Sequence, residues 1–429
     1  MQYGTQAPLE AFTAGGGISD QVTQFYGRFP YPRLSVLRQV HPGDFSVARL
    51  NYVLRRRRSD QLPGGLKIWI PGAGTTLAVQ TALNFPEASI LATDLSSQSL
   101  AISGALADEL GLRNITFEIQ DLMRADYREL FDFVDCAGVV NHVEDPVRAM
   151  RVIRQSLTAT GAAAIFVYNS HHRWLSDAWQ QAIAIVSGGS KSMDVRFDVA
   201  RRLHRAIRKS KRLVSIQAPL DVLEQEVDLG AFADTLLHPN EVSFTIDQVH
   251  ELVSAGGLRF AGWRDPHDWQ IANYLDRPVD LAGRELTELE SSRLVWALTR
   301  DDSPLFDFYV VRDDFDGGRP FTQSELLRRR IMAYRGATYY TIREGRLHSK
   351  WYCDCMRQSE GRFEVMLNED TREKSQRWRR LSRSQADLLR RAQEGTSAQR
   401  LISEGTRLGR AAAAGLIAEL LDPRAGVLA

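Results

Sequence analysis

The stretch LKIWIPGAGTTLAVQTALNFP, residues 66–86, decides the fold class of this chain. LKIWIP is a short apolar run that ends at Gly72, as a buried parallel strand does, and TTLAVQTALNFP has the spacing of a helix. Between them, the turn Gly72-Ala73-Gly74 lets the backbone approach a ligand closely, because glycine has no Cβ. The stretch therefore predicts a strand, a ligand-binding turn and a helix.

The same alternation continues on the C-terminal side of this stretch. Further expected strands are SILATDLS (89–96), ITFEIQD (115–121), FDFVDCAGVV (131–140) and AAAIFVYN (162–169), and the expected helices are Gln98–Leu110, ending at Gly111, and Val147–Leu157. Such βα units predict a parallel sheet with helices on both faces. FTIDQVHELVSAGGLRFAGWRD and LFDFYVVRD then predict a helix and two closing strands, which complete a seven-stranded Rossmann-like α/β sheet.

Changes of pattern divide the chain into three predicted parts. Residues 1–62 are expected to form an N-terminal lid that covers the substrate, and 63–312 the nucleoside-binding domain with a helical insertion at about 171–230. Residues 313–429 are expected to be a small helical or winged-helix-like accessory domain, with helical runs at Ser384–Gln393, Ser397–Glu404 and Arg410–Leu421. A helix is also expected over Ala48–Arg58.

Composition narrows the class of protein. The chain has 429 residues, 44% of them hydrophobic, a formal net charge of +1 and only three cysteines. These values predict a globular cytoplasmic protein without a disulfide framework. The first residues, MQYGTQAPLEAF, do not have the pattern of a signal peptide, and no uncharged apolar run approaches the roughly 18–20 residues of a membrane span, so neither is expected. We expect a small-molecule or peptide substrate, no membrane partner and no nucleic-acid partner; a homodimer is left open.

Acidic residues follow the second and third expected strands. Asp94 can accept both hydroxyls of a ribose, while Asp121 can meet an adenine amino group beside the apolar Leu122. Since the carboxyl ends of parallel strands share one edge of a sheet, these groups predict a nucleoside-binding crevice. Leu77 stands where a dinucleotide fingerprint needs its last glycine, which favours S-adenosyl-L-methionine (SAM) over a pyrophosphate cofactor.

These motifs, together with the 131–169 segment, resemble the class I SAM-dependent methyltransferases. More narrowly, QFYGRFPYPR (24–33) and LLHPNEVSFTIDQVHELVSAGGLRFAGW (236–263) resemble a bacterial subgroup with an upstream FY-x-x-x-PYP element. The chain departs from this pattern at three positions. Ile70 replaces an acid, Thr76 replaces a glycine, and Asn141 replaces the first histidine of a pair, leaving His142 alone.

The resemblance and the strand ends together imply the site residues. Cofactor binding is expected from Tyr26, Tyr31, Arg33, Pro71, Gly72, Ala73, Gly74, Asp94, Leu95, Asp121, Leu122, Ala137 and Gly138. His142, Tyr31, Tyr168 and His238 are the catalytic candidates, with His142 as the general base; packing or capping roles are the alternatives for each. Aromatic faces of the upstream element can contact the sulfonium, and Arg33 can pair with the methionine carboxylate.

Other conspicuous residues are assigned no chemistry. Cys353 and Cys355 fall short of the four ligands that zinc takes, so no metal is expected. The arginine runs 55–58 and 328–330 are interpreted as solvated helix faces. The basic run 201–212 is expected above the active site, where it could meet an acidic substrate.

The function expected from the sequence is methyl transfer to an oxygen or nitrogen atom of a small metabolite or peptide-type biosynthetic intermediate. One alternative is a protein or carrier-bound substrate docked by the C-terminal domain. The other is a non-catalytic SAM-binding regulator whose tail binds DNA.

Overall fold

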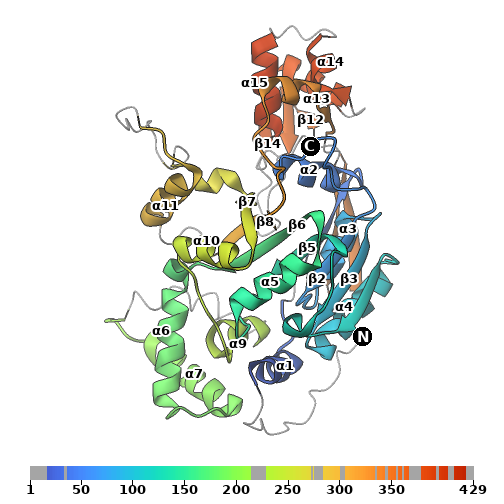
Figure 1. The fold of residues 1–429 in the computed structure, drawn as a ribbon. Coiled ribbons are helices and arrows are strands. Elements are labelled where there is room, and N and C mark those ends of the chain that lie inside the picture. Colours follow the sequence, from blue (N-terminus) through green and yellow to red (C-terminus); the bar gives the residue numbers. More distant parts are fainter. Residues whose placement is uncertain are drawn as a thin grey trace.

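The computed structural model describes residues 17–32, 36–213, 229–271, 274, 284–299, 305–333, 336–343, 346–353, 356–359, 362–366, 378–392, 396–403 and 410–421. A seven-stranded sheet lies at the centre of Figure 1, and helices cover both of its faces. Among the described helices, none combines the length and apolar character needed to cross a membrane.

The expected Rossmann-like sheet is confirmed. Its strands, in the order in which they lie side by side, are β4 (Ile115–Ile119), β3 (Ser89–Asp94), β2 (Lys67–Pro71), β5 (Phe131–Ala137), β6 (Leu157–Tyr168), β8 (Leu305–Arg312) and β7 (Leu258–Trp263). The first five are mutually parallel, whereas β8 runs antiparallel to both of its neighbours. The chain order reverses between β2 and β5, and ligands bind at the carboxyl ends of strands beside such a reversal.

Two hydrophobic layers hold the sheet between its helices. On one face lie α3 (Leu77–Asn84) and α4 (Ser97–Glu109), and on the other α5 (Pro146–Ser156) and α10 (Ile246–Ala255). Local sequence sets where α4, α5 and α10 begin, because Ser96, Asp145 and Thr245 each accept a hydrogen bond from a backbone N–H of the first turn. Gly111, with φ of +68°, follows the end of α4 as expected.

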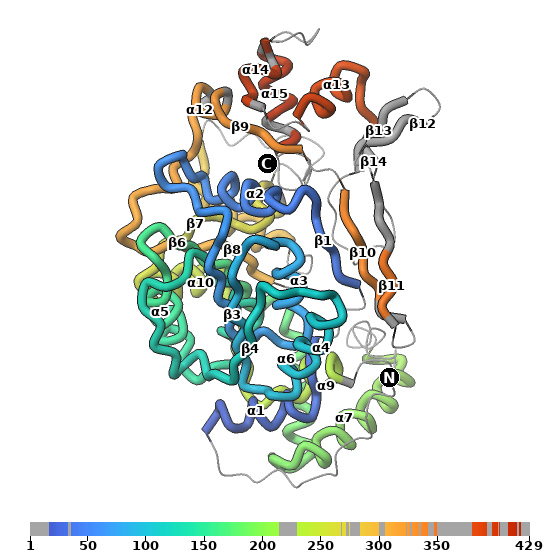
Figure 2. The backbone as a smooth tube through the Cα atoms, turned by 90° about the vertical axis from the view of Figure 1, so that its right-hand side faces the viewer, coloured from blue at the N-terminus to red at the C-terminus, as the bar shows by residue number. Residues whose placement is uncertain are grey.

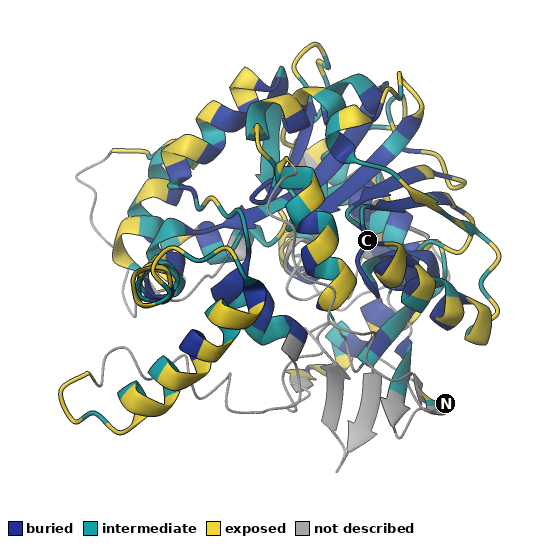
Figure 3. Ribbon diagram, turned by 90° about the horizontal axis from the view of Figure 1, so that it is seen from below, coloured by how far each residue is buried: buried dark blue, intermediate teal, exposed yellow. Residues whose placement is uncertain are grey.

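The insertion after β6 is helical in its described part. Its helices α6 (Ser170–Val186), α7 (Met193–Arg208) and α9 (Leu229–Leu237) share a separate hydrophobic cluster with α1 (Ile18–Arg28). Figure 1 places this group below the sheet, at the carboxyl ends of β2, β3 and β5. Seen from that end in Figure 3, the strands are largely buried and the outer helix faces are exposed. The insertion and α1 thus enclose the edge where a nucleoside site is expected.

The C-terminal part contains strands as well as helices. Its elements are α12 (Gln323–Arg328), β9 (Arg330–Ile331), β10 (Gly336–Arg343), β11 (Arg346–Cys353), β12 (Met356–Ser359), β13 (Arg362–Met366), β14 (Trp378–Leu381), α13 (Arg383–Ala392), β15 (Thr396–Ser397), α14 (Ala398–Ser403) and α15 (Arg410–Leu421); α11 (Glu288–Leu298) precedes them. The last three helices lie where the sequence predicted helical runs, whereas the positions of the strands were not predicted. Cys355 falls outside the described residues.

An N-terminal strand joins this C-terminal part. Residues Val36–His41 form β1, which pairs antiparallel with β10. Figure 2 shows the two segments side by side. The following helix α2 (Phe45–Val53) buries Phe45 against the C-terminal helices. It is shorter than the expected Ala48–Arg58, because Arg55 leaves the helical conformation with φ of +56°. The domain boundaries at 62 and 312 stay a prediction, but this pairing links the two outer parts directly.

The arginine run after α2 is not a solvated helix face, so that expectation is wrong. Arg56 is fully buried, with its guanidinium 4.1 Å from the centre of the Phe315 ring. Its neighbour Arg57 donates a hydrogen bond to Glu325 at 2.7 Å. These two arginines therefore fasten residues 55–58 to the segment that follows β8.

Candidate functional site

A cavity of about 500 Å³ opens at the carboxyl ends of the parallel strands. Thirteen residues proposed from the sequence line it, namely Tyr26, Tyr31, Gly72, Ala73, Gly74, Asp94, Leu95, Asp121, Leu122, Ala137, Gly138, His142 and Tyr168. The volume lies within the range of about 300–1,000 Å³ that is typical of ligand sites. The residues gathered from separate motifs of the sequence therefore meet around one cavity.

The glycine turn forms one wall of this cavity and has no room for larger residues. Gly72 and Gly74 adopt φ of +63° and +58°, a region that favours glycine. A Cβ on Gly72 would lie 2.2 Å from a methyl carbon of Val139, and one on Gly74 would lie 2.8 Å from the Tyr31 carbonyl oxygen. The bare backbone of the turn thus fits the close approach that a nucleoside needs.

Two carboxylates at successive strand ends are fixed by backbone donors. Asp94 accepts hydrogen bonds from the N–H groups of Gly74 and Ser96, each at 2.8 Å. Burial raises the pKa of Asp94, and these backbone hydrogen bonds act in the opposite direction. Asp121 accepts from the Met123 N–H at 2.8 Å and from the Ser19 hydroxyl of α1 at 2.8 Å. Because a carboxylate has about four acceptor positions, both groups retain capacity for ribose or adenine donors.

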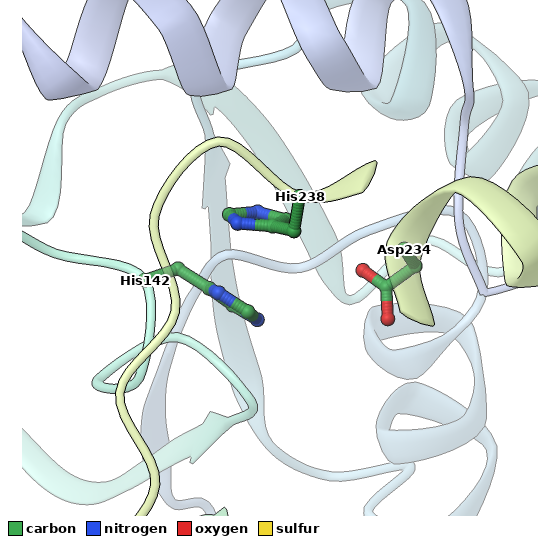
Figure 4. Close-up of side chains that lie close together, drawn as sticks. All are labelled: His142, Asp234 and His238. Carbon is green, nitrogen blue, oxygen red and sulfur yellow. The ribbon is translucent and has the colours of Figure 1, made fainter. Parts of the chain in front are cut away.

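On the acceptor side of the cavity, three buried side chains converge. His142 follows β5, Asp234 belongs to α9 and His238 follows α9; one polar atom from each lies within 4.8 Å of the others. Figure 4 shows the two imidazole rings facing one another, with the Asp234 carboxylate directed toward them. The ring centres are 3.8 Å apart. A titratable cluster of this kind can hold an acceptor group and take its proton.

The backbone N–H and carbonyl of Asn240 set the orientation of both rings. Its carbonyl oxygen lies 2.9 Å from His142 Nδ1, and its N–H donates to His238 Nδ1 at 3.2 Å. Since a carbonyl only accepts, Nδ1 of His142 carries the proton and its Nε2 keeps a lone pair. Since a backbone N–H only donates, Nδ1 of His238 keeps the lone pair and the neutral ring carries its proton on Nε2.

Both imidazoles are neutral near pH 7. Burial lowers the pKa of His142 to about 4, partly offset by the hydrogen bond with Asn240. Burial, together with the nearby His142, holds the pKa of His238 well below its usual value. Within the described part of the chain, the Nε2 atoms of both rings lack a hydrogen-bond partner. A buried polar atom without a partner is costly, so a ligand is the natural complement here.

Tyrosines and an ion pair surround this cluster. The Tyr26 hydroxyl donates to Asp234 at 2.8 Å, and burial beside that carboxylate raises the pKa of Tyr26 well above 10, so the phenol stays protonated. Tyr168 packs edge-on against His142, and the Arg173 guanidinium lies 4.2 Å from the Tyr168 ring centre. Arg173 itself donates to Glu241 at 2.7 Å. The pair therefore ties α6 to the 240–242 segment behind the histidines.

A few expected site residues lie elsewhere. His238 and Pro71 are not among the residues that line the cavity, although His238 packs on His142. Arg33 lies outside the described residues. The basic run 201–212 includes no residue that lines the cavity. Asp234 was missed, although its place four residues before His238, on the same short apolar helical stretch, was the available signal.

The three residues that depart from the sequence pattern of the resembled family lie in different surroundings. Ile70 is fully buried within β2, away from the cavity lining. Thr76 lines the cavity, with its hydroxyl 3.4 Å from the Pro32 carbonyl oxygen, so the extra side chain fastens the upstream element. Asn141 is buried, and neither end of its amide has a hydrogen-bond partner among the described residues.

A protein-family model matches the part of the chain that carries most of this site. Residues 69–213, which span the glycine turn, both carboxylates and His142, match a family model described as a methyltransferase domain. The chain is 28% identical over 318 residues to the uncharacterized protein syc1184_c of Synechococcus sp., covering 70% of this chain and 74% of that protein.

Two solved structures of PKMT2 from Rickettsia typhi share the fold. The one in complex with AdoHcy has a TM-score of 0.58 at 13% identity and covers 93% of this chain and 77% of that chain. The other has a TM-score of 0.60 at 11% identity, with coverages of 93% and 76%.

Proposed function

We infer that this chain, which is a SAM-dependent methyltransferase, transfers the methyl group to an oxygen or nitrogen atom of a small metabolite or peptide-type biosynthetic intermediate. The observation that carries this proposal is the neutral, buried His142, whose Nε2 lone pair has no described partner and which lines the cavity. Such a group serves only where the acceptor loses a proton as it is methylated.

The part of the cavity formed by the glycine turn and the two strand-end carboxylates, here called the cofactor half, would hold SAM as follows. Asp94 would accept the ribose hydroxyls and Asp121 the adenine amino group, while Leu95 and Leu122 flank the base. The bound cofactor supplies a methyl group already activated by the sulfonium. The chain's main tasks are therefore to align the acceptor atom and to exclude water.

The part of the cavity around His142, here called the acceptor half, is enclosed, and this favours a small or slender substrate. Its walls are Tyr26 of α1, Tyr168 at the end of β6, and Ala231 and Asp234 of α9. No described residue after Asp234 lines the cavity, so the C-terminal part would not touch the reacting atoms. A small molecule, or one side chain of a peptide, fits this arrangement.

One observation favours the alternative, a protein or carrier-bound substrate. Strand β1 shares a sheet with β10 and begins four residues after Pro32, which lines the cavity. A partner bound to the C-terminal part would thus lie next to a segment that leads into the site.

Calorimetry tests the core of the proposal. The protein should bind both SAM and S-adenosylhomocysteine, and Asp94→Ala should weaken both. A screen of acceptors follows, in which turnover on small hydroxyl or amine compounds supports the proposal. A failure of well-folded protein to bind either nucleoside would overturn it.

Surface substitutions then separate the two substrate classes. Removing the C-terminal part would expose Val40 and Phe45, so exposed arginines of α13 are better targets. Arg383→Glu with Arg390→Glu should leave turnover of a small molecule unchanged. A selective loss of turnover on a macromolecular substrate would favour the alternative.

A further inference from the structure

The Nε2 atoms of the two histidines of the site have opposite hydrogen-bonding roles. The backbone carbonyl of Asn240 holds the proton of His142 on Nδ1, and the backbone N–H of the same residue leaves that of His238 on Nε2. The Nε2 atoms are therefore one acceptor, on His142, which lines the cavity, and one donor, on His238, whose ring centre lies 3.8 Å from that of His142. Neither has a hydrogen-bond partner in the described part of the chain.

This arrangement is enclosed and held from behind. His142 and His238 are only 5% and 3% exposed. The Asn240 side chain donates to the carbonyl oxygens of His142 at 3.2 Å and Val143 at 3.0 Å, which joins the two segments that carry the rings. A second link runs from the Val242 N–H to the Asn141 carbonyl oxygen at 2.9 Å. The unpartnered ends are thus a built feature of the site.

We propose that the paired Nε2 atoms of His142 and His238 bind the hydroxyl group that receives the methyl group, so that the substrate is an alcohol or a phenol. The inference rests on the proposed methyl transfer and names its acceptor. A hydroxyl has one hydrogen and two lone pairs. It donates to His142, accepts from His238, and keeps one lone pair for the methyl carbon.

Other groups fit the two Nε2 atoms less well than a hydroxyl does. An ammonium offers only N–H groups, which the Nε2–H of His238 repels, and its pKa of about 10.4 lies far above that of His142. A carboxylate offers only acceptors, which the lone pair of His142 repels. A metal ion needs a lone pair from both rings, whereas the backbone N–H of Asn240 keeps the proton of His238 on Nε2.

The chemical step then balances. The free lone pair of the oxygen forms the new C–O bond while the methyl–sulfur bond breaks and leaves its electron pair on sulfur. The O–H proton passes to Nε2 of His142, so the positive charge of the sulfonium ends on an imidazolium. Asp234, which has a carboxylate oxygen within 4.8 Å of one nitrogen of each ring, stabilises that charge. A weak base is sufficient, because a methylated oxygen that still carries its proton is a strong acid.

Nitrogen NMR of the histidine rings tests the proposal without turnover. The full chain labelled with ¹⁵N-histidine is measured at pH 7, and the signals are assigned with His142→Gln and His238→Gln. We expect a protonated Nδ1 for His142 and a protonated Nε2 for His238. The reverse assignment for either ring, or a shift of both Nε2 signals on adding Zn²⁺ or Mn²⁺, would overturn the proposal.

Three ring compounds then probe the acceptor subsite in the presence of S-adenosylhomocysteine. Phenol should shift both Nε2 signals, whereas anisole, which lacks the hydroxyl hydrogen, and benzylamine should shift them several-fold less. No response to phenol, or an equal response to benzylamine, would overturn the proposal. His250 provides the matched control, since its Nε2 is also unpartnered in the described chain but lies on α10, away from the cavity lining.

The outcomes distinguish this inference from the proposed function. If the protein fails to bind SAM, the proposed methyl transfer is wrong, while the ring protonation states can still be measured. If SAM binds and an amine or carboxylate is methylated, the methyl transfer stands and the hydroxyl subsite is wrong.

Discussion

The two halves of the cavity are built in different ways. The cofactor half consists of the glycine turn and strand-end acids between residues 72 and 138, held mainly by backbone hydrogen bonds. The acceptor half brings His142 together with Asp234 and His238, about a hundred residues further along the chain. The first half depends on local conformation and the second on the packing of the helical insertion. Substitutions should therefore separate binding of SAM from transfer of the methyl group.

The largest expected effect comes from His142→Gln. The variant keeps a polar side chain of similar reach but cannot take a proton, so kcat should fall by about 10²–10⁴-fold. Binding of SAM, measured by calorimetry, should stay unchanged, because His142 belongs to the acceptor half. His250→Gln is the control and should leave both quantities unaltered. A weakened affinity for SAM in His142→Gln would show that the two halves are not separable.

The pH dependence of stability sharpens the same contrast. The pKa of His142 is about 4 in the folded chain and about 6.5 when unfolded, so the unfolded state binds more protons between these values. The contribution of His142 to the free energy of unfolding is fully present above pH 6.5 and is lost as the pH falls toward 4. The total loss is about 3 kcal/mol. The free energy of unfolding of His142→Gln should fall less steeply than that of the unsubstituted chain in this window. If denaturant titrations gave the same pH dependence of the unfolding free energy for His142→Gln and the unsubstituted chain, the lowered pKa of His142 would be contradicted.

In the cofactor half, the main expected effect is on affinity. Asp94→Ala removes a buried carboxylate that would accept the ribose hydroxyls, so the Kd for SAM should rise about 100-fold, or about 2.7 kcal/mol. Asp108→Ala, an exposed acid on α4, should leave the Kd unchanged. An undiminished affinity of Asp94→Ala would place the nucleoside elsewhere.

A smaller effect is expected from Gly74→Ala. The new Cβ would lie 2.8 Å from the Tyr31 carbonyl oxygen at a φ of +58°, so the free energy of unfolding should fall by about 2 kcal/mol. Gly104→Ala is the matched control. A Cβ there, within α4, meets only Phe117 at 3.9 Å and should add up to about 1 kcal/mol of stability. Equal changes in thermal unfolding would contradict the claim that the turn specifically requires glycine.

The sheet was readable from the sequence for a physical reason. Buried parallel strands are short apolar runs, and several helix starts carry a capping residue, such as Asp145 or Thr245. These signals are local, so the strand ends, and with them Gly72, Asp94 and Asp121, could be placed on one edge of the sheet. Arg56 shows the opposite case. An arginine run normally indicates a solvated face, and only packing against Phe315 and the core sheet buries it.

By itself, the sequence determined the α/β class, the glycine turn and the carboxylates of the cofactor half, because backbone conformation and strand periodicity are set within a few residues. Only the tertiary structure decided that β1 joins β10, that Asp234 faces His142, and that the backbone of Asn240 sets the protons of two histidines. These features depend on contacts between segments roughly a hundred or more residues apart. No local pattern encodes the distance or orientation of such segments, because these follow from how the helices and sheets pack.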